Sequence, residues 1–212
     1  MKTTLCAAIA AFFAAHAIAQ TRDVPAKALP VPDTVSPQIQ KLIALPLSGT
    51  YNQIPTTNEE WKKQIRGVEE ATAKGLPALR EALKVKVEPT TLDGVKAYIV
   101  TPENIPARNR NRLLVHVHGG CFASFAGESG TVEAIYMAGF GGFKVISVDY
   151  RTPPDHPYPA PLDDAMTAWK AATKMANPKN MAIFGSSAGG NLTLAMVTAS
   201  RHTIMASSIA AG

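Results

Sequence analysis

Two short segments of the sequence hold residues whose types and spacing could do chemistry together. Residues 185–189 read GSSAG, and residues 118–121 read HGGC. A G-x-S-x-G segment between a strand and a helix presents its serine on a sharp turn as a nucleophile. A glycine-rich loop can aim backbone N–H groups at the oxyanion that forms when such a serine attacks a carbonyl carbon. The pair therefore indicates acyl transfer, with Ser187 as the attacking group.

The surroundings of Ser187 support this interpretation, which the five-residue pattern alone would not, because small residues recur by chance. The apolar run Met181–Phe184 precedes the pattern, and helical spacing begins at Gly190. Gly185 and Gly189 flank the turn, where side chains would collide with the neighbouring strand and helix. A phosphate-binding turn or a glycine-rich helix start is the alternative interpretation, but no lysine or acidic partner accompanies the motif.

The elements that must position these segments alternate between strand and helix. Nearly continuous apolar runs over 113–117, 145–148 and 181–184 predict strands that are buried on both faces of a sheet. Helical spacing follows the second and third runs, in Leu162, Ala165, Met166 and Trp169 and in Leu192, Ala195, Met196 and Ala199. The alternation predicts an α/β fold with a mostly parallel sheet and helices on both faces.

The N-terminal half predicts two helices and a hairpin. Residues 36–37 are a Ser-Pro pair, which is typical of the N-cap and first turn of a short helix. Thr57 and Glu60 form a capping box for a second helix. Apolar residues then alternate over residues 85–99 around an Asp-Gly turn at 93–94, which indicates two antiparallel strands.

The first residues are typical of a targeting segment. Lys2 supplies a positive start, residues 5–15 are an unbroken apolar run, and residues 17–19 form a small-x-small cleavage site. We therefore expect a signal peptide over residues 1–19 that is removed on export to the periplasm or the extracellular space. The apolar run is too short to span a bilayer, so we expect no stable membrane anchor. The proline-containing residues 20–32 are expected to form an irregular leader.

Composition narrows the class of protein further. Removal of the signal leaves about 190 residues, enough for one domain, and lowers the formal charge of +5 by one. Cys121 is then the single thiol, so we expect no internal disulfide. Basic residues are scattered apart from Arg108, Arg110 and Arg112, which alternate with Asn in a turn-like stretch. A solvated loop explains that triplet better than a nucleic-acid site.

Three motifs in order make the chain resemble a known family. Residues 118–121, 149–160 and 185–191 are similar to motifs of the hormone-sensitive-lipase family of bacterial esterases, bacterial family IV. Within that family the chain is similar to small esterases and lactone hydrolases that carry a non-acidic residue, here Ser186, before the nucleophile. The resemblance implies an α/β-hydrolase fold, with a helical cap in residues 20–83 and a core in 84–212.

The resemblance also implies roles for the two chemical segments. Ser187 is expected to be the nucleophile, and the backbone N–H groups of Gly120, Cys121 and Ala188 are expected to form the oxyanion hole. The residues expected to shape the two loops are His118, Gly119, Gly185 and Gly189. The implied substrate is a small carboxylic ester or lactone, and the implied chemistry requires neither a metal nor a cofactor.

The acid and base of a serine triad are missing from their expected places. In this fold an Asp or Glu and then a His follow the nucleophile. After Ser187 the sequence has one histidine, His202, and no acidic residue. His202 lies several turns along the helix that starts at the motif, too far to act as the base. His156, Asp163 and Asp164 precede the nucleophile, in a segment that the family uses structurally.

We therefore expect a partial core that lacks about two or three strand–helix units. A further strand is expected to begin within residues 207–212, and an exposed apolar sheet edge is expected to make the chain poorly soluble. Without an acid and a base, the chain as given is expected to be inactive. Two alternatives stay open: a non-catalytic member of the fold that binds a small ligand, and a serine peptidase built on the same turn. No pattern indicates the oligomeric state.

Overall fold

The chain falls into two units, residues 1–53 and residues 54–212. The computed structural model describes residues 28–47, 49 and 53–210, so the expected signal peptide lies outside the described residues. In the first unit, α2 runs over Pro37–Ile43, and Ser36 Oγ accepts a hydrogen bond from the Ile39 N–H at 3.4 Å. This contact confirms the predicted N-cap. The elements described below belong to the second unit.

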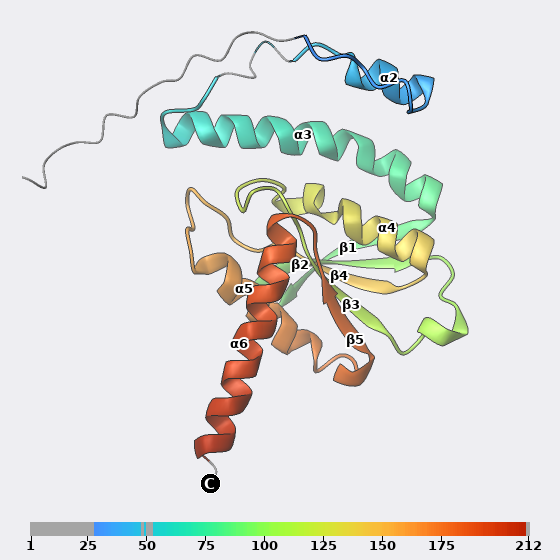
Figure 1. The fold of residues 1–212 in the computed structure, drawn as a ribbon. Coiled ribbons are helices and arrows are strands. Elements are labelled where there is room, and N and C mark those ends of the chain that lie inside the picture. The colour runs from blue at the N-terminus through green and yellow to red at the C-terminus, as the bar shows by residue number, and fades with distance from the viewer. Residues whose placement is uncertain (1–27, 48, 50–52, 211–212) are drawn as a thin grey trace, which may run out of the picture. The chain divides into compact units, whose positions relative to one another are not determined.

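A five-stranded sheet forms the middle of the second unit, in the order β1-β2-β4-β3-β5 (Figure 1). The strands are β1 (Val85–Leu92), β2 (Val95–Pro102), β3 (Leu113–Val117), β4 (Lys144–Val148) and β5 (Met181–Phe184). β1 and β2 form the predicted hairpin, β2 also pairs antiparallel with β4, and β3 runs parallel to β4 and β5. The predicted strands are confirmed, and the sheet is mixed because the hairpin adds to its parallel part in the antiparallel direction.

Helices cover both faces of this sheet, as the alternation of strand and helix predicted. The helices are α3 (Asn58–Leu83), α4 (Val132–Gly141), α5 (Ala160–Ala172) and α6 (Ala188–Ala210). α5 and α6 pack on one face, and α3 and α4 pack on the other (Figure 1). Along β4, Ile146 and Val148 face α5 and α6, whereas Val145 faces α3 and α4. Burial on both faces explains why the strand sequences are almost continuously apolar.

α3 begins at the predicted capping box. Thr57 Oγ1 accepts a hydrogen bond from the Glu60 N–H, and Glu60 Oε2 accepts one from the Thr57 N–H, both at 3.2 Å. Leu76 is the residue that this helix buries fully, in the apolar cluster shared with α4 and the sheet. Trp61 and Val68, nearer the start of the helix, are exposed.

Polar contacts also tie α3 to the segment that follows β3. Glu69 Oε1 accepts a hydrogen bond from the Ala126 N–H at 2.9 Å, and Arg80 forms an ion pair with Glu128 at 2.9 Å. α3, which was expected to belong to a cap of residues 20–83, therefore packs with the core. The division between the two units comes earlier in the chain, between residues 53 and 54.

α6 is longer than the sequence indicated. The expectation of a strand over residues 207–212 is wrong for residues 207–210, which continue α6, while residues 211–212 lie outside the described part. No glycine or proline interrupts residues 191–210, and the alanine, leucine and methionine there favour helix, so nothing in the sequence ends α6 earlier. β5 is the outermost strand on its side of the sheet, and its residues are mostly half-buried.

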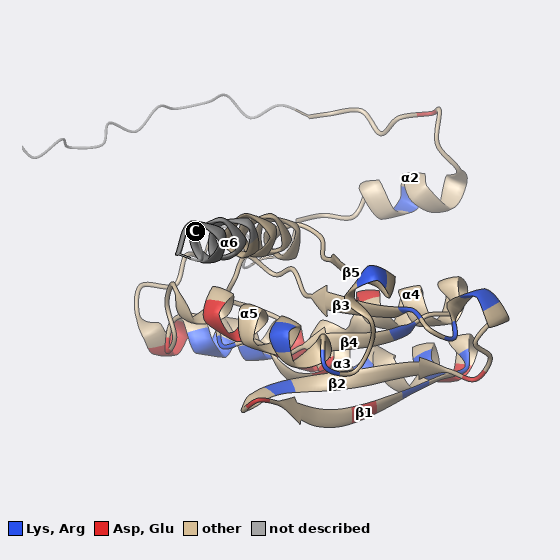
Figure 2. Cartoon of the chain, turned by 90° about the horizontal axis from the view of Figure 1, so that it is seen from below, with Lys and Arg blue, Asp and Glu red and all other residues tan. Residues whose placement is uncertain are grey.

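The solvated loop that was predicted for the arginine triplet is present in the structure. Arg108, Arg110 and Arg112 are exposed in the turn between β2 and β3, and Lys and Arg residues are spread over several elements in Figure 2. Cys121 is a free, exposed thiol. Among the residues described, no helix is long and apolar enough to cross a membrane, and no group of His, Cys, Asp and Glu side chains could hold a metal ion.

Candidate active site

Ser187 lies on a sharp turn between the end of β5 and the start of α6. Its backbone has a φ of 51°, in the left-handed region that residues other than glycine rarely adopt. The carbonyl oxygens of Ser186 and Ser187 accept hydrogen bonds from the N–H groups of Gly190 and Asn191, each at 3.1 Å, which starts the helix immediately. The serine is therefore held at the amino end of α6, where the helix dipole is positive.

The two glycines of the motif let this turn lie against the end of β3. A Cβ atom on Gly185 would lie 2.2 Å from the carbonyl oxygen of Val117, and one on Gly189 would lie 2.1 Å from the same oxygen. Both contacts are with backbone, which has no rotamer that could relieve them. The collision predicted from the sequence is therefore present, and its partner is the last residue of β3.

Residues 118–121 form a tight loop directly after β3. Gly120 and Cys121 have φ values of 103° and 55°, and the N–H groups of Ala123 and Ser124 close the turn on the Gly120 carbonyl oxygen at 3.0 and 2.9 Å. A Cβ on Gly120 would lie 2.5 Å from the Ser124 carbonyl oxygen, so only glycine fits there. Within the described residues, no hydrogen bond to another protein group uses the N–H of Gly120 or of Cys121. Both N–H groups can therefore serve an oxyanion.

The loop and the turn meet in one cavity of about 490 Å³. The members of the two motifs that line it are His118, Gly119, Gly120, Cys121, Ser186 and Ser187. The approach is close, because a Cβ on Gly119 would lie 3.5 Å from Ser187 Cβ. Ala188 is buried as the first residue of α6, where helical N–H groups have no partner within the helix. The tertiary fold thus places a candidate nucleophile beside candidate oxyanion donors.

His118 is a buried, neutral part of the loop. Its Nδ1 lies 2.8 Å from the Gly119 carbonyl oxygen, so Nδ1 carries the hydrogen. The ring stacks on Tyr150 with centroids 4.0 Å apart, and the Tyr150 hydroxyl donates to the His118 carbonyl oxygen at 2.6 Å. Burial lowers the pKa of His118 to about 4, which keeps the ring uncharged at neutral pH. These contacts are what a residue that shapes the loop requires.

Known proteins are similar to this chain in sequence and in fold. Residues 114–210 match a family described as alpha/beta hydrolase fold. The carboxylesterase NlhH of Mycobacterium tuberculosis is 33% identical over 154 residues, which cover 64% of this chain and 46% of that protein. The crystal structure of an esterase E25 has a TM-score of 0.75 and 34% identity, covering 88% of this chain and 57% of that chain. A hormone-sensitive lipase from a metagenome library has a TM-score of 0.59 and 25% identity, covering 72% and 47% respectively.

The chain has the α/β-hydrolase fold and is similar to esterases and to a hormone-sensitive lipase. The fold and the family resemblance that the three motifs predicted are thereby confirmed. The chain spans between 32% and 46% of the length of the first curated relatives that it matches.

The acidic and basic residues that precede Ser187 lie in the segment that runs from the end of β4 into α5. His156 lies in an exposed turn, where its N–H donates to the Thr152 carbonyl oxygen at 3.1 Å. Asp163 is in the first turn of α5. Asp164 is buried and binds the Arg151 guanidinium through Nη2 at 2.8 Å and Nε at 2.9 Å. This ion pair fixes the chain as it leaves β4.

The Ser187 hydroxyl has no acid–base partner in the described part of the chain. No hydrogen bond joins it to a histidine or a carboxylate among these residues. The backbone at position 202 lies in α6 about four turns beyond the nucleophile, a separation that rules it out as the base.

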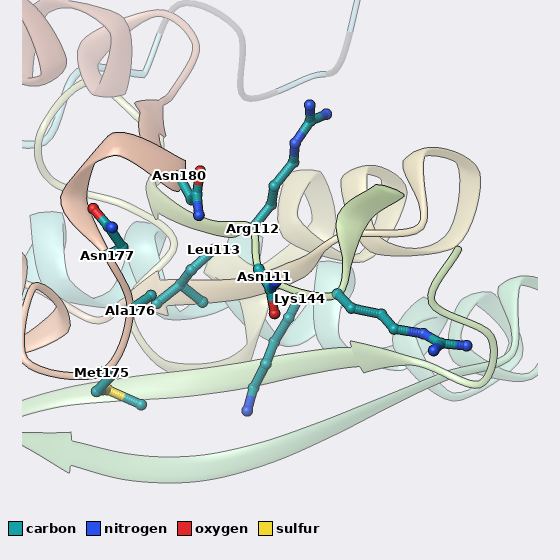
Figure 3. Close-up of a pocket in the computed structure, with 9 residues that line it drawn as sticks. Asn111, Arg112, Leu113, Lys144, Met175, Ala176, Asn177 and Asn180 are labelled. Atoms are coloured by element: carbon teal, nitrogen blue, oxygen red, sulfur yellow. The ribbon is translucent and has the colours of Figure 1, made fainter. Parts of the chain in front are cut away.

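A second cavity, of about 450 Å³, lies at the amino ends of the parallel strands (Figure 3). Three cationic residues line it: Arg110, Arg112 and Lys144. The side chains of Arg112 and Lys144 point in different directions in Figure 3. Ligands of open α/β sheets bind at the carboxyl ends of the strands. We therefore place the site at the cavity beside Ser187.

Sequence reasoning missed the charged wall of the Ser187 cavity. Glu133, in the first turn of α4, lines the cavity, and its Oε2 lies 3.0 Å from His116 Nε2. Its Oε1 accepts a hydrogen bond from the Ser186 hydroxyl. The His116 contact, followed by Ser186, lowers the pKa of Glu133 to about 2 against the effect of burial. The one signal in the sequence was a histidine inside the apolar run that became β3.

Sequence reasoning also missed how the far end of the oxyanion loop is held. The Ala126 N–H donates to Glu69 of α3 at 2.9 Å, and the next N–H, of Gly127, donates to Asp149 at 2.7 Å. Burial raises the pKa of both carboxyl groups. Asp149 belongs to a motif that was recognised without this role, and Glu69 has no sequence signal because its contact is made across the fold.

We predict that replacing Gly189 with alanine destabilises the hydrolase by more than about 3 kcal/mol, because the new Cβ would meet the Val117 backbone. Gly75→Ala is the matched control, since nothing lies within 4 Å of a Cβ at that position of α3. That change should be neutral or stabilise by up to about 1 kcal/mol. Urea unfolding of both variants measures the difference, and similar stabilities would contradict the close packing of the turn.

We also predict that buried His118 makes stability depend on pH. Its pKa is about 4 in the fold against an ordinary value of 6.5, so between these values the unfolded chain binds a proton that the folded chain excludes. The free energy of unfolding should therefore fall by about 3 kcal/mol as the pH drops from 6.5 to 4. The free energy of unfolding, measured against pH, should show this fall in the parent and in His156→Asn, a control at an exposed residue. The fall should be absent in His118→Asn. An unchanged slope in His118→Asn would contradict the assignment.

Proposed function

We propose that this chain provides the nucleophile and the oxyanion hole of a serine hydrolase that acts on carboxylic esters or lactones. The observation that carries the proposal is the single cavity lined by Ser187, which has a left-handed backbone, and by Gly120 and Cys121, whose N–H groups are free. The names of the relatives, a carboxylesterase and an esterase among them, support the same reaction class.

In the proposed reaction, the Ser187 oxygen attacks the carbonyl carbon of the substrate. The C–O bond that forms leaves a tetrahedral intermediate whose oxyanion accepts hydrogen bonds from Gly120, Cys121 and Ala188 N–H groups. Collapse of the intermediate releases the alcohol, and water then releases the acid from the acyl-serine. The hole uses backbone N–H groups, so a cysteine side chain at position 121 is compatible with it.

We propose further that the 212-residue chain by itself does not turn esters over, because the Ser187 proton has no acceptor among the described side chains. Neutral His118 is engaged with the backbone, and Glu133 is engaged with Ser186 and His116. The same observation favours a second candidate function, in which the cavity binds a small ligand without catalysis. Covalent reaction at Ser187 separates the two.

A fluorophosphonate probe tests the nucleophile and the hole without requiring turnover. Attack by Ser187 forms an O–P bond and releases fluoride, with the proton passing to water. We expect slow, stoichiometric labelling that intact-mass and peptide analysis place on Ser187, and no labelling of Ser187→Ala. Cys121→Ser should label like the parent, because the hole uses the backbone N–H there. Labelling at another residue, or none in the folded parent, would overturn the nucleophile and favour the ligand-binding function.

Hydrolysis of p-nitrophenyl butyrate tests the proposed inactivity. The measurement uses residues 20–212, since the first 19 residues are expected to be removed on export. We expect a rate equal to that of Ser187→Ala, because the lack of a base costs on the order of 10⁶ in kcat. Turnover that disappears in Ser187→Ala would contradict this expectation and would show that another group accepts the proton.

A further inference from the structure

A row of buried polar side chains runs beneath the nucleophile turn, on the face of the sheet that α4 covers. His116, in the middle of β3, has Ser147 of β4 and Phe184 of β5 as its neighbours in the sheet register. The imidazole is fully buried, with Nδ1 2.9 Å from Ser147 Oγ and Nε2 3.0 Å from Glu133 Oε2. Its ring centroid lies 4.9 Å from that of Phe184. Three strands and a helix therefore give this ring one orientation.

Glu133 connects this row to the turn. One carboxylate oxygen faces His116 Nε2, and the other accepts the Ser186 hydroxyl. A carboxylate can only accept hydrogen bonds, so Nε2 of His116 must carry a hydrogen, and the buried ring fixes the carboxylate in place. The low pKa of Glu133, about 2, keeps it ionised at neutral and mildly acidic pH. The Ser186 hydroxyl therefore meets a fixed and permanently charged acceptor.

The turn needs support from outside its own chain segment. A left-handed φ at a serine is unfavourable and persists only where the surroundings determine it. α6 holds the carbonyl oxygens of Ser186 and Ser187, and the flanking glycines pack on Val117. The contact from Ser186 to Glu133 adds a side-chain tie to a different element, α4, immediately before the nucleophile.

We propose that Glu133 is a positioning residue for the nucleophile turn. By accepting the Ser186 hydroxyl, it holds the adjacent Ser187 in the orientation that faces the oxyanion loop, and His116 holds Glu133. The proposal rests on the proposed function, in which Ser187 is the nucleophile. It also explains why a hydroxyl stands at position 186: a carboxylate there would face the Glu133 carboxylate, and like charges repel.

Hydrogen–deuterium exchange of the full 212-residue chain tests the proposal without requiring catalysis. The reporters are the N–H groups of Gly190 and Asn191, which bind the carbonyl oxygens of the turn. Peptides from the β1–β2 hairpin report general loosening of the fold. The variants to compare are Ser186→Ala, Ser186→Thr, Glu133→Gln, the double change of Ser186→Ala with Glu133→Gln, and the control Glu128→Gln. Glu128 lies just before α4, and its ion pair with Arg80 is on the surface.

Ser186→Ala should raise reporter exchange about tenfold or more, because it removes one hydrogen bond to a charged group. Ser186→Thr, which keeps a hydroxyl, should restore slow exchange, and Glu128→Gln should leave the reporters unchanged. Glu133→Gln should act in the same direction as Ser186→Ala, and the double variant should exceed neither single variant. The hairpin should exchange at the parent rate throughout. Should Glu133→Gln fail to fold, the two Ser186 variants carry the test.

Labelling of Ser187 by the fluorophosphonate probe gives the second reading. We expect the labelling rate to fall about tenfold in Ser186→Ala and to return in Ser186→Thr. Parent-like reporter exchange in Ser186→Ala, failure of Ser186→Thr to restore it, or additive effects in the double variant would each overturn the positioning role. Reporter exchange could follow the expected pattern while the probe labels neither the parent nor any variant. In that case the positioning contact between Glu133 and Ser186 stands, and the proposal that Ser187 is the nucleophile fails.

Discussion

The carbonyl oxygen of Val117 is the point at which the three parts of the site meet. β3 ends there, the loop that carries Gly120 starts there, and both glycines of the nucleophile turn lie against it. Any side chain at Gly185 or Gly189 would push β5 and α6 away from β3. The distance between the nucleophile and the oxyanion donors therefore depends on a backbone contact that only glycine permits.

Three carboxylates bind the turn and the loop that meet at this contact. Glu133 fixes the turn from α4, and Glu69 and Asp149 bind successive N–H groups at the far end of the oxyanion loop. Glu69 belongs to α3, so a helix that precedes the whole sheet in the chain takes part in shaping the loop. Carboxylates that accept backbone N–H groups in partly buried positions are well suited to this task, because the low local dielectric strengthens such hydrogen bonds.

The family assignment and the catalytic interpretation have different supports. The fold follows from the alternation of strands and helices and from the likeness to solved esterases. The proposed reaction rests on the geometry at Ser187, where a candidate nucleophile lies near N–H donors and no base is present among the described residues. The proposed site, with oxyanion donors and with no base among the described residues, would separate two contributions to catalysis that are usually measured together.

The sequence by itself determined the strands, the N-caps of α2 and α3 and the two chemical segments, because each depends on local patterns; it did not indicate α4. Apolar runs, the capping box at Thr57 and the glycines around Ser187 have their effects within a few residues of the chain. The sequence analysis missed the continuation of α6 past residue 206, where the composition favours helix and no residue ends the helix. Only the tertiary structure showed that Glu133 and His116 support the turn and that Glu69 supports the loop. These contacts join residues far apart in the chain, and their energies depend on burial and distance, which no local pattern contains.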